Sequence, residues 1–264
     1  LIIGARTGPL QLLLYSVFHI GNATNNITWK SYEHIKSRPE IDWVVPLSLG
    51  DSHKGFRVLG TNNDFFSRFR YGRKRNLSFA EGQSFDGVLD VILGADVAKT
   101  LNYGLGDAII ISHGLGKVSF ASHDNLPFKV VGILAPTGTP VDQTVHVPLE
   151  GIEAIHIGWG KTARPGKKNI TPQNLKDADL KPRAITAVLV GLTSKMKVFR
   201  FQRAVNEYPR EPLMAILPGV ALQGLWALMG TAEKALTVIS LFVVIAGLLG
   251  MLTMILSGLN ERRR

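Results

Sequence analysis

Residues 235–264 read ALTVISLFVVIAGLLGMLTMILSGLNERRR. No charged residue occurs from Ala235 to Asn260, and Leu, Val, Ile, Met and Ala make up most of this segment. About 20 apolar residues in a helix are enough to cross the hydrocarbon core of a bilayer. The segment therefore predicts a transmembrane helix over residues 235–259. The alternative interpretation is the buried core helix of a soluble protein, in which an uncharged run of this length is rare.

Three arginines follow the predicted span at once, at positions 262–264. Basic residues in short flanking segments are retained on the cytoplasmic side of a membrane. We therefore expect residues 260–264 to begin a cytoplasmic segment, and the residues before Glu233 to lie outside the cytoplasm. A helix that begins near Gly219 and contains no proline can continue into the span, so residues 219–234 are predicted to form a stalk helix.

The composition excludes several classes of function. The 264 residues include no cysteine, so neither a disulfide nor a catalytic or metal-binding thiol is available. The net charge of +10 is spread over Arg68–Arg75, Lys161–Arg203 and the terminal arginines, without a DNA-binding motif or interleaved aromatic residues. A nucleic-acid partner is therefore not expected. The basic runs indicate either attraction to anionic lipid headgroups or an ordinary solvated surface.

Short strand and helix patterns alternate before the span, which predicts an α+β fold: a mixed α/β extracytoplasmic domain over residues 1–218, followed by the stalk. Residues 161–182 are rich in Lys, Pro, Asn and Asp and are expected to be an exposed loop or insertion. Helix patterns cover residues 26–38, 61–69, 95–104 and 194–208. Strand patterns cover residues 41–50, 55–61, 88–94, 108–112, 126–136, 184–192 and 212–219. Turns or loops are expected at residues 50–55, 77–87 and 137–140.

Polar residues mark the expected helix starts, because their side chains can accept hydrogen bonds from the first free N–H groups. Asn26 and Thr28 are the candidates for the first of these helices. Asn62 or Asn63 is expected to cap the second helix, and Ser194 the last one before the stalk.

Two apolar groups and one proline can be placed relative to the core. Phe65, Phe66 and Phe69 have a helical spacing and are expected to face the core. Residues 9–20, PLQLLLYSVFHI, are too few to cross a bilayer, so they predict either part of the core or an exposed surface for a lipid or an amphipathic partner. The strand that contains Pro46 is expected to be kinked or exposed there, because proline lacks a ladder donor.

The sequence lacks the common catalytic motifs. It contains no GxxxxGK[ST] loop, GxSxG elbow, HExxH pair or CxxC pair, so no catalytic residue and no cofactor is predicted. His113 and His123, with Asp124 beside the second, flank a possible hairpin and suggest a metal site. The alternative is that both are solvated loop histidines. His146 and His156 are expected to be structural or exposed.

Several stretches follow one another in a familiar order: LIIGARTGPLQLLLYSVFHIGNATNNI, VVPLSLGDSHKGFRVLGT, LSFAEGQSF, VILGADVAKTLNYGLGD, FKVVGILAPTGTPVDQTVHVPLE and a final span with NERRR. Together they resemble the MacB/FtsX-like permeases of ABC transporters, over about residues 1–160 and 183–264. LGADVAKTLNYGLGDAIII is similar to the strand, helix, GD turn and strand unit of that family. GLNERRR resembles the start of the cytoplasmic segment that leads to the ATPase contact. Residues 161–181 depart from the family pattern.

The resemblance implies a function in transport. In such permeases an extracytoplasmic core domain lies between the first and second of four membrane helices, so residues 1–218 would be that domain and residues 235–259 the second span. ATP hydrolysis would occur in a separate subunit, which makes this chain no enzyme. The stalk would relay motion outward, for export or extraction of a lipoprotein, peptide or amphipathic molecule.

The implied partners are a cytoplasmic ABC ATPase, a second permease copy, a periplasmic adaptor or lipoprotein, and the lipids of a bacterial inner membrane. Gly247 and Gly250 in the span agree with helix partners in the bilayer, because small residues allow close approach. The alternative function is a membrane-tethered extracytoplasmic sensor of a ligand, or of a metal bound through His113 and His123.

Overall fold

A computed structural model describes residues 1–113, 126–156 and 179–262. The chain divides into two compact units, Leu1–Pro218 and Gly219–Arg264. The first unit is a mixed α/β domain and the second is one long helix, so the predicted fold class is confirmed. The helices are α1 Pro9–Val17, α2 Trp29–Lys36, α3 Asp64–Arg68, α4 Ala95–Leu101, α5 Leu149–His156, α6 Val198–Asn206 and α7 Pro218–Glu261, with 3-10 turns η1 Pro140–Gln143 and η3 Lys195–Lys197.

A mixed sheet organises the first unit. Its strands run in the order β15, β1, β14, β3, β4, β12, β8, β11 and β7, with β10 paired to β3 and β9 to β11. The pairs β8–β11 and β4–β12 are parallel and the other pairs of this sheet are antiparallel. Its strands are β1 Ile2–Ala5, β3 Ile41–His53, β4 Phe56–Thr61, β7 Phe79–Gly82, β8 Asp90–Leu93, β9 Ala108–Ile109, β10 Ser112–His113, β11 Phe128–Leu134, β12 Thr144–Pro148, β14 Ala187–Leu192 and β15 Leu213–Ile216. Two small ribbons pair β2 Ile27–Thr28 with β13 Ala184–Ile185, and β5 Arg70–Tyr71 with β6 Arg75–Asn76.

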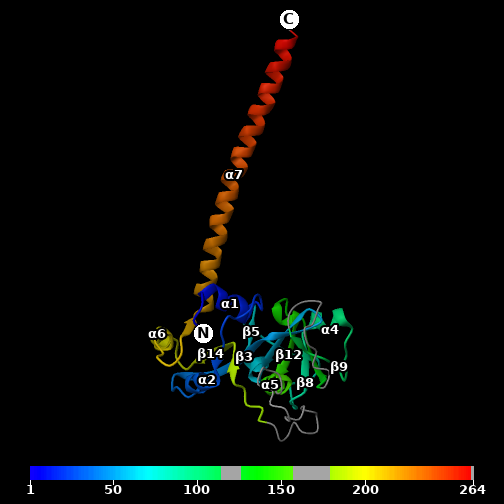
Figure 1. Ribbon diagram of the computed structural model, residues 1–264, viewed down its shortest axis with the longest axis vertical. Coiled ribbons are helices and arrows are strands. Elements are labelled where there is room, and N and C mark those ends of the chain that lie inside the picture. The colour runs from blue at the N-terminus through cyan, green and yellow to red at the C-terminus, as the bar shows by residue number, and fades with distance from the viewer. Residues whose placement is uncertain (114–125, 157–178, 263–264) are drawn as a thin grey trace, which may run out of the picture. The chain divides into compact units, whose positions relative to one another are not determined.

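Strand β3 joins two packed halves of this unit. Its first part, Ile41–Leu47, pairs with β14, and its second part, Ser48–His53, pairs with β4. Figure 1 shows α2, α6 and β14 to one side of β3, and β8, β9 and α4 to the other. The strand is therefore longer than the pattern at residues 41–50 predicts, because its second half also has a partner.

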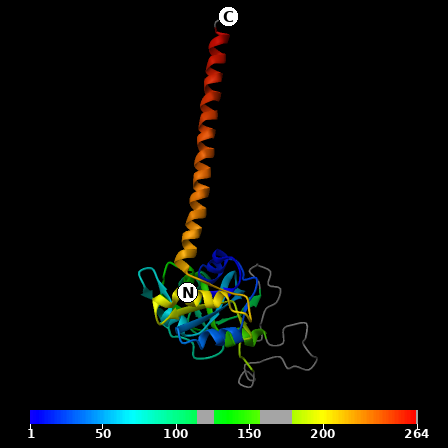
Figure 2. The same ribbon diagram turned by 90° about the vertical axis from the view of Figure 1, so that its left-hand side faces the viewer.

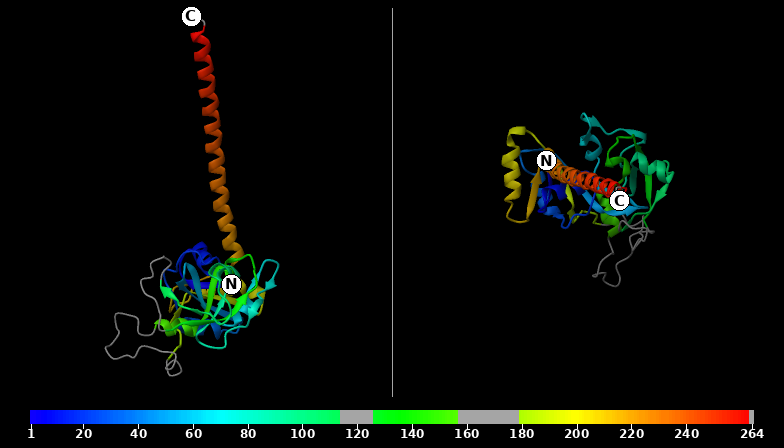
Figure 3. Two further views of the ribbon diagram at one scale, coloured as in Figure 1. Left: turned by 90° about the vertical axis from the view of Figure 1, so that its right-hand side faces the viewer. Right: turned by 90° about the horizontal axis from the view of Figure 1, so that it is seen from above.

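Each half has its own apolar core. One core combines side chains of β4, β8, β11 and β12 with α4 and α5: Val58, Val91, Leu93, Val97, Phe128, Val145 and Ile155. The other combines β1, β14 and β15 with α2 and α6: Ile3, Ile35, Val188, Phe201, Val205 and Ala215. In the second half β1 lies between β14 and β15, so segments from both ends of the unit meet there. The view from above in Figure 3 shows these blue and yellow segments together.

Several local predictions are confirmed. Thr28 caps α2, since its hydroxyl accepts a hydrogen bond from the N–H of Ser31. Ser194 caps η3, which leads directly into α6. The apolar segment at residues 9–20 forms α1, with Leu12 and Leu13 fully buried, so the core alternative was correct for this helix.

Other local predictions are wrong. The turn expected at residues 50–55 shrinks to Lys54 and Gly55, which both have positive φ, as a two-residue hairpin turn requires. Residues 77–87, expected to be a loop, contain β7, which pairs with β11. Pro46 is buried rather than exposed, and its carbonyl accepts a hydrogen bond from Thr61 Oγ1. Each of these differences results from contacts with residues that are distant in the sequence.

The predicted cap of α3 is also wrong. Asn63 makes no cap hydrogen bond, because its side-chain amide instead bonds both the N–H and the carbonyl of Phe85. Asn62, the other candidate, does not cap the helix either, since its Oδ1 is buried without a hydrogen-bond partner. Phe65 and Phe66 are buried as expected, while Phe69 is half-buried. The predicted loop at residues 161–182 lies outside the described residues up to position 178.

Candidate functional site

The longest element of the chain is also its clearest functional feature. Helix α7 contains 44 residues, with Pro218 at its first position, where the fixed φ of proline suits a helix start. Figure 2 shows it as one unbroken helix. Residues Pro218–Gly258 are long and apolar enough to cross a membrane. At 1.5 Å per residue such a helix is about 62 Å long, roughly twice the hydrocarbon thickness of a bilayer.

The composition of α7 makes it suitable for contact with lipid on all sides. Large apolar side chains, including Leu236, Ile239, Leu241, Phe242 and Val243, are each more than half exposed, so they cover all sides of the helix. A helix that is apolar on every face is suited to lipid, since its backbone groups are already hydrogen-bonded to one another. The first half of α7 is less uniform, because Glu233 and Lys234 interrupt its apolar residues.

In the first unit, a buried histidine, His146, lies in β12, and a half-buried one, His19, contacts Thr144 of the same strand. His146 is fully buried against the rings of Phe65 and Phe66, whose centroids are 5.4 and 5.7 Å from its own. Neither of its ring nitrogens has a hydrogen-bond partner. The pKa of His146 is lowered to about 3, mainly by burial and to a smaller extent by the nearby His19, while the backbone of Ile92 acts in the opposite direction. His146 is therefore a neutral, structural side chain.

The hydrogen-bond pattern around His19 fixes its tautomer. Thr144 Oγ1 donates its proton to the carbonyl of Pro140 at 2.7 Å, so Nδ1 of His19, 2.8 Å from the same oxygen, must be the donor in that contact. Burial, followed by the charge of Arg57, lowers the pKa of His19 to about 4. Both histidines are thus neutral at physiological pH and pack the interior beside β12.

A further polar group lies at the end of β3, where Asp51, Ser52 and His53 are consecutive and buried. Nδ1 of His53 donates to the carbonyl of Ile110 at 2.6 Å, which leaves Nε2 to accept from the hydroxyl of Tyr103 at 3.1 Å. Burial lowers the pKa of His53, and the carbonyl of Ile110 opposes that shift. Sequence reasoning missed this group, since it placed these residues in an exposed turn.

The structure describes the backbone of one of the two histidines that suggested a metal site, and the other lies outside the described residues. His113 lies in β10, directly opposite Asp51 of β3. His123 and Asp124 lie outside the described residues, so their part in a metal site stays a prediction. Among the side chains that the structure does describe, no group of three His, Cys, Asp or Glu is arranged to hold a metal ion. His156, expected to be structural or exposed, is half-buried, and its Nε2 is 3.9 Å from Asp51 Oδ1.

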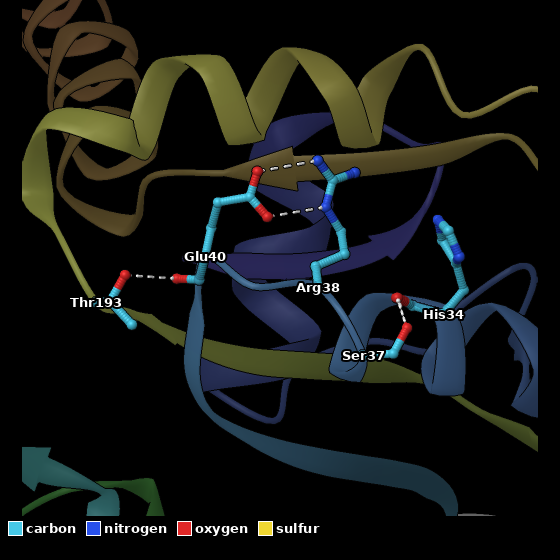
Figure 4. Close-up of polar contacts among 5 residues, drawn as sticks. All are labelled: His34, Ser37, Arg38, Glu40 and Thr193. Carbon is cyan, nitrogen blue, oxygen red and sulfur yellow. Dashed lines mark hydrogen bonds and ion pairs between the residues drawn. The ribbon is translucent and has the colours of Figure 1, made fainter.

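Polar contacts in the other half of the unit involve the connection between α2 and β3 (Figure 4). Arg38 and Glu40 form an ion pair at 3.4 Å, and hydrogen bonds from Arg38 lower the pKa of Glu40. Thr193 Oγ1 donates to the carbonyl of Glu40 at 3.3 Å. The guanidinium of Arg38 also lies 5.2 Å from the ring centre of Phe201 in α6. The contact of Arg38 with Phe201 connects α6 to the segment between α2 and β3.

Comparison with known families gives these features a context. A family model described as the MacB-like periplasmic core domain matches residues 6–206, about three quarters of the chain. The chain belongs to this family. The resemblance to MacB/FtsX-like permeases is therefore confirmed, and the first unit is the periplasmic domain of a MacB-like ABC transporter permease.

Two solved structures are similar to this MacB-like chain. The periplasmic region of MacB from Actinobacillus actinomycetemcomitans matches with a TM-score of 0.49 and 12% identity, over 85% of this chain and 91% of that one. The extracellular domain of the noncanonic ABC-type transporter YknZ from Gram-positive bacteria matches with a TM-score of 0.45 and 13% identity, over 82% of this chain and 98% of that one. No curated protein sequence matches at a significant level.

The residues matched by the family model include the polar groups described above. His19, His146 and Arg38 all lie within the part of the chain that matches the MacB-like domain. Only Leu217 lies between the end of β15 and the start of helix α7.

Proposed function

We propose that this chain is part of an ABC transporter permease that couples ATP hydrolysis in a cytoplasmic partner to movement of its periplasmic domain. The movement would serve the export or extraction of a lipoprotein, a peptide or an amphipathic small molecule. ATP hydrolysis itself belongs to the separate ATPase subunit. The observation that carries the proposal is the continuity of α7 from Pro218 to Glu261.

A continuous helix is a suitable relay, because its backbone hydrogen bonds resist compression and bending. Sharp bends in helices occur mainly at proline, and α7 contains none after its first position. We propose that residues 219–234 form the stalk, residues 235–259 cross the membrane and residues 260–264 enter the cytoplasm. The charged pair Glu233 and Lys234 supports this boundary, since charged side chains are costly inside a bilayer.

The proposed assembly contains two permease copies in a bacterial inner membrane, with a cytoplasmic ABC ATPase and a periplasmic adaptor or lipoprotein. Gly247 and Gly250 lie within the proposed span and have open space around them, so a second helix can approach closely there. The arginines at positions 262–264 favour a cytoplasmic C-terminal side.

The test asks whether the stalk must be a rigid helix or only a connection of the right length. The full-length permease is reconstituted with its ATPase in lipid nanodiscs, with residues 219–233 replaced either by a Gly/Ser linker or by an alanine-rich helix of equal length. Met196→Cys, at a position that is 92% exposed, adds a site for a spin label to a segment that contains no cysteine of its own, and any cysteine elsewhere in the full-length permease is replaced by serine. The distance between the labels of two copies is then measured with and without a non-hydrolysable ATP analogue.

The expected result is a nucleotide-dependent distance change in the wild type and in the alanine-rich variant. The Gly/Ser variant is expected to hydrolyse ATP without that change, because a flexible linker does not transmit displacement. An unchanged response in the Gly/Ser variant would contradict the relay. If no ATPase associates with the permease, the transporter assignment is wrong and a membrane-tethered sensor becomes the better explanation.

A further inference from the structure

Helix α6 is apolar on two opposite sides. Its inner side buries Phe201 and Val205 in the core that it shares with α2, β1, β14 and β15. On the outer side Phe199 is 74% exposed, and Met196 in the preceding turn η3 is 92% exposed. These are the two most exposed large apolar side chains among the described residues of the first unit. A surface helix needs only one apolar side to pack on its own domain, so the outer pair needs a separate explanation.

Four exposed cationic side chains surround this apolar pair: Lys195, Lys197, Arg200 and Arg203. None of the four forms an ion pair with an acidic side chain in the described part of the chain. The charge of Lys197 does help to lower the pKa of Glu40, but that carboxylate is already paired with Arg38. Helix α6 also has no acidic residue in its first turn, where the helix dipole favours one. The outer side of α6 therefore carries an excess of positive charge.

The arrangement of these side chains suits a helical partner. From Met196 to Arg203 the exposed side chains follow the spacing i, i+3, i+4 and i+7 of one helix face. Helices pack by fitting such ridges of side chains into the grooves of a second helix. Aromatic residues, Met and Arg are also enriched in protein interfaces, which have an apolar centre and a polar rim. Figure 1 and the view from above in Figure 3 show α6 at the margin of the first unit, where a partner can reach it.

Two other occupants fit these observations less well. A second copy of this chain that used the same face would bring two sets of cations together, and like charges repel. A bilayer attracts cations, but the proposed stalk, residues 219–234, is about 24 Å long at 1.5 Å per residue. Gln202 of α6 bonds the carbonyl of Ala215, three residues before α7 begins, and salt limits charge attraction to about 8–10 Å. The proposed stalk therefore favours a protein partner over the bilayer.

We propose that Met196, Phe199 and the four cations around them, together called the α6 surface, dock an acidic amphipathic helix of a protein partner outside the cytoplasm. The apolar stripe of the partner helix covers Met196 and Phe199. Its Asp and Glu side chains pair with the cations, among which Arg200 and Arg203 can each hold a carboxylate through two parallel hydrogen bonds. The inference rests on the proposed function for the position of the domain outside the cytoplasm and for the stalk.

The test measures the binding of a defined peptide to the full-length permease in nanodiscs of zwitterionic lipid, without nucleotide or ATPase. The probe is a fluorescent helical peptide of about three heptads, with a leucine stripe and glutamate at its other positions. A comparison peptide has lysine in place of glutamate. Binding is followed by fluorescence anisotropy, and the signal from empty nanodiscs is subtracted. The variants of the α6 surface are Phe199→Ser and the double variant Arg200→Glu with Arg203→Glu.

Two matched controls make the same chemical changes elsewhere in the first unit. Ile20→Ser removes another exposed apolar side chain, and Arg73→Glu with Arg75→Glu reverses two exposed cations near the turn between β5 and β6. We expect the wild type to bind the glutamate peptide at least tenfold more tightly than the lysine peptide. Both variants of the α6 surface are expected to lose at least tenfold in affinity for the glutamate peptide, and both controls to keep it. The charge reversal in α6 is also expected to increase the affinity for the lysine peptide.

Two results contradict the proposal. One is equal affinity of the glutamate peptide for the wild type and for the α6 variants, whose folding is checked by their melting temperatures, or no binding to the wild type at micromolar concentrations. The other comes from flotation with vesicles that contain anionic phosphatidylglycerol: if these bind the wild type but not Phe199→Ser, and the peptide binds neither, the α6 surface contacts a membrane. Since the assay contains no ATPase or nucleotide, its failure is distinguishable from failure of the proposed relay.

Discussion

The buried His146 gives a prediction for the pH dependence of stability. Its pKa is about 3 in the folded protein and close to 6.5 in the unfolded chain, because burial disfavours the charged imidazolium. Between these two values the unfolded state binds more protons than the folded state. Stability contributed by the neutral ring is therefore complete above pH 6.5 and is lost progressively as the pH falls toward 3.

The size of the effect follows from proton linkage. At pH 5 the unfolded imidazole is almost fully protonated and the folded one is neutral, so His146 alone lowers the free energy of unfolding by about 2 kcal/mol relative to pH 8. For a domain of this size that corresponds to a fall of roughly 4–8 °C in melting temperature. Replacement of His146 by Leu removes this contribution and also removes two buried nitrogens without partners.

The assay compares the wild type and His146→Leu in thermal unfolding of the detergent-solubilised full chain at pH 8 and pH 5. The pH 8 measurement serves as the internal reference. We expect the wild type to lose about 2 kcal/mol more than the variant on acidification, with the remaining loss shared by other groups such as His19, whose folded pKa is about 4. Equal losses in the two proteins would refute the reasoning, because His146 would then titrate alike in both states.

Three further substitutions test the packing and the caps of the domain. Gly191→Ala is expected to cost about 1–3 kcal/mol in a melting experiment, because a Cβ there would lie only 2.1 Å from the Trp43 ring, whereas Gly50→Ala, which meets nothing within 4 Å, should change the melting temperature far less. Asp142→Asn should lower the urea midpoint by an amount equivalent to about 1–3 kcal/mol, since its carboxylate accepts several hydrogen bonds from the preceding turn; an unchanged midpoint would show that these bonds add nothing. Thr28→Ala removes the cap of α2 and should cost about 0.5–2 kcal/mol, while Thr28→Ser should retain most of the stability.

Features that depend on neighbours along the chain could be predicted from the sequence. The start of α7 near Gly219, the caps at Thr28 and Ser194, and the apolar length of the last helix all depend on residues within one or two turns. The family resemblance also follows from the order of local stretches. The predicted cap at Asn63 is wrong, because the side chain binds Phe85 instead. Phe85 is 22 residues away in the sequence, so no local pattern indicates this contact.

Strand pairing and the polar groups at strand ends were decided only by the tertiary structure. The sequence pattern at residues 79–82 is weak, and these residues form β7 because they pair with β11. Strand β3 extends to His53 because β4 and β10 pair with its second half. The approach of Asp51 to His156, 105 residues apart, has no local signal in the sequence. By itself the sequence determined an α+β domain followed by a long apolar helix, since periodicity and hydrophobicity are local properties. Which polar side chains are buried together depends on sheet register, and register is fixed only when distant strands pair.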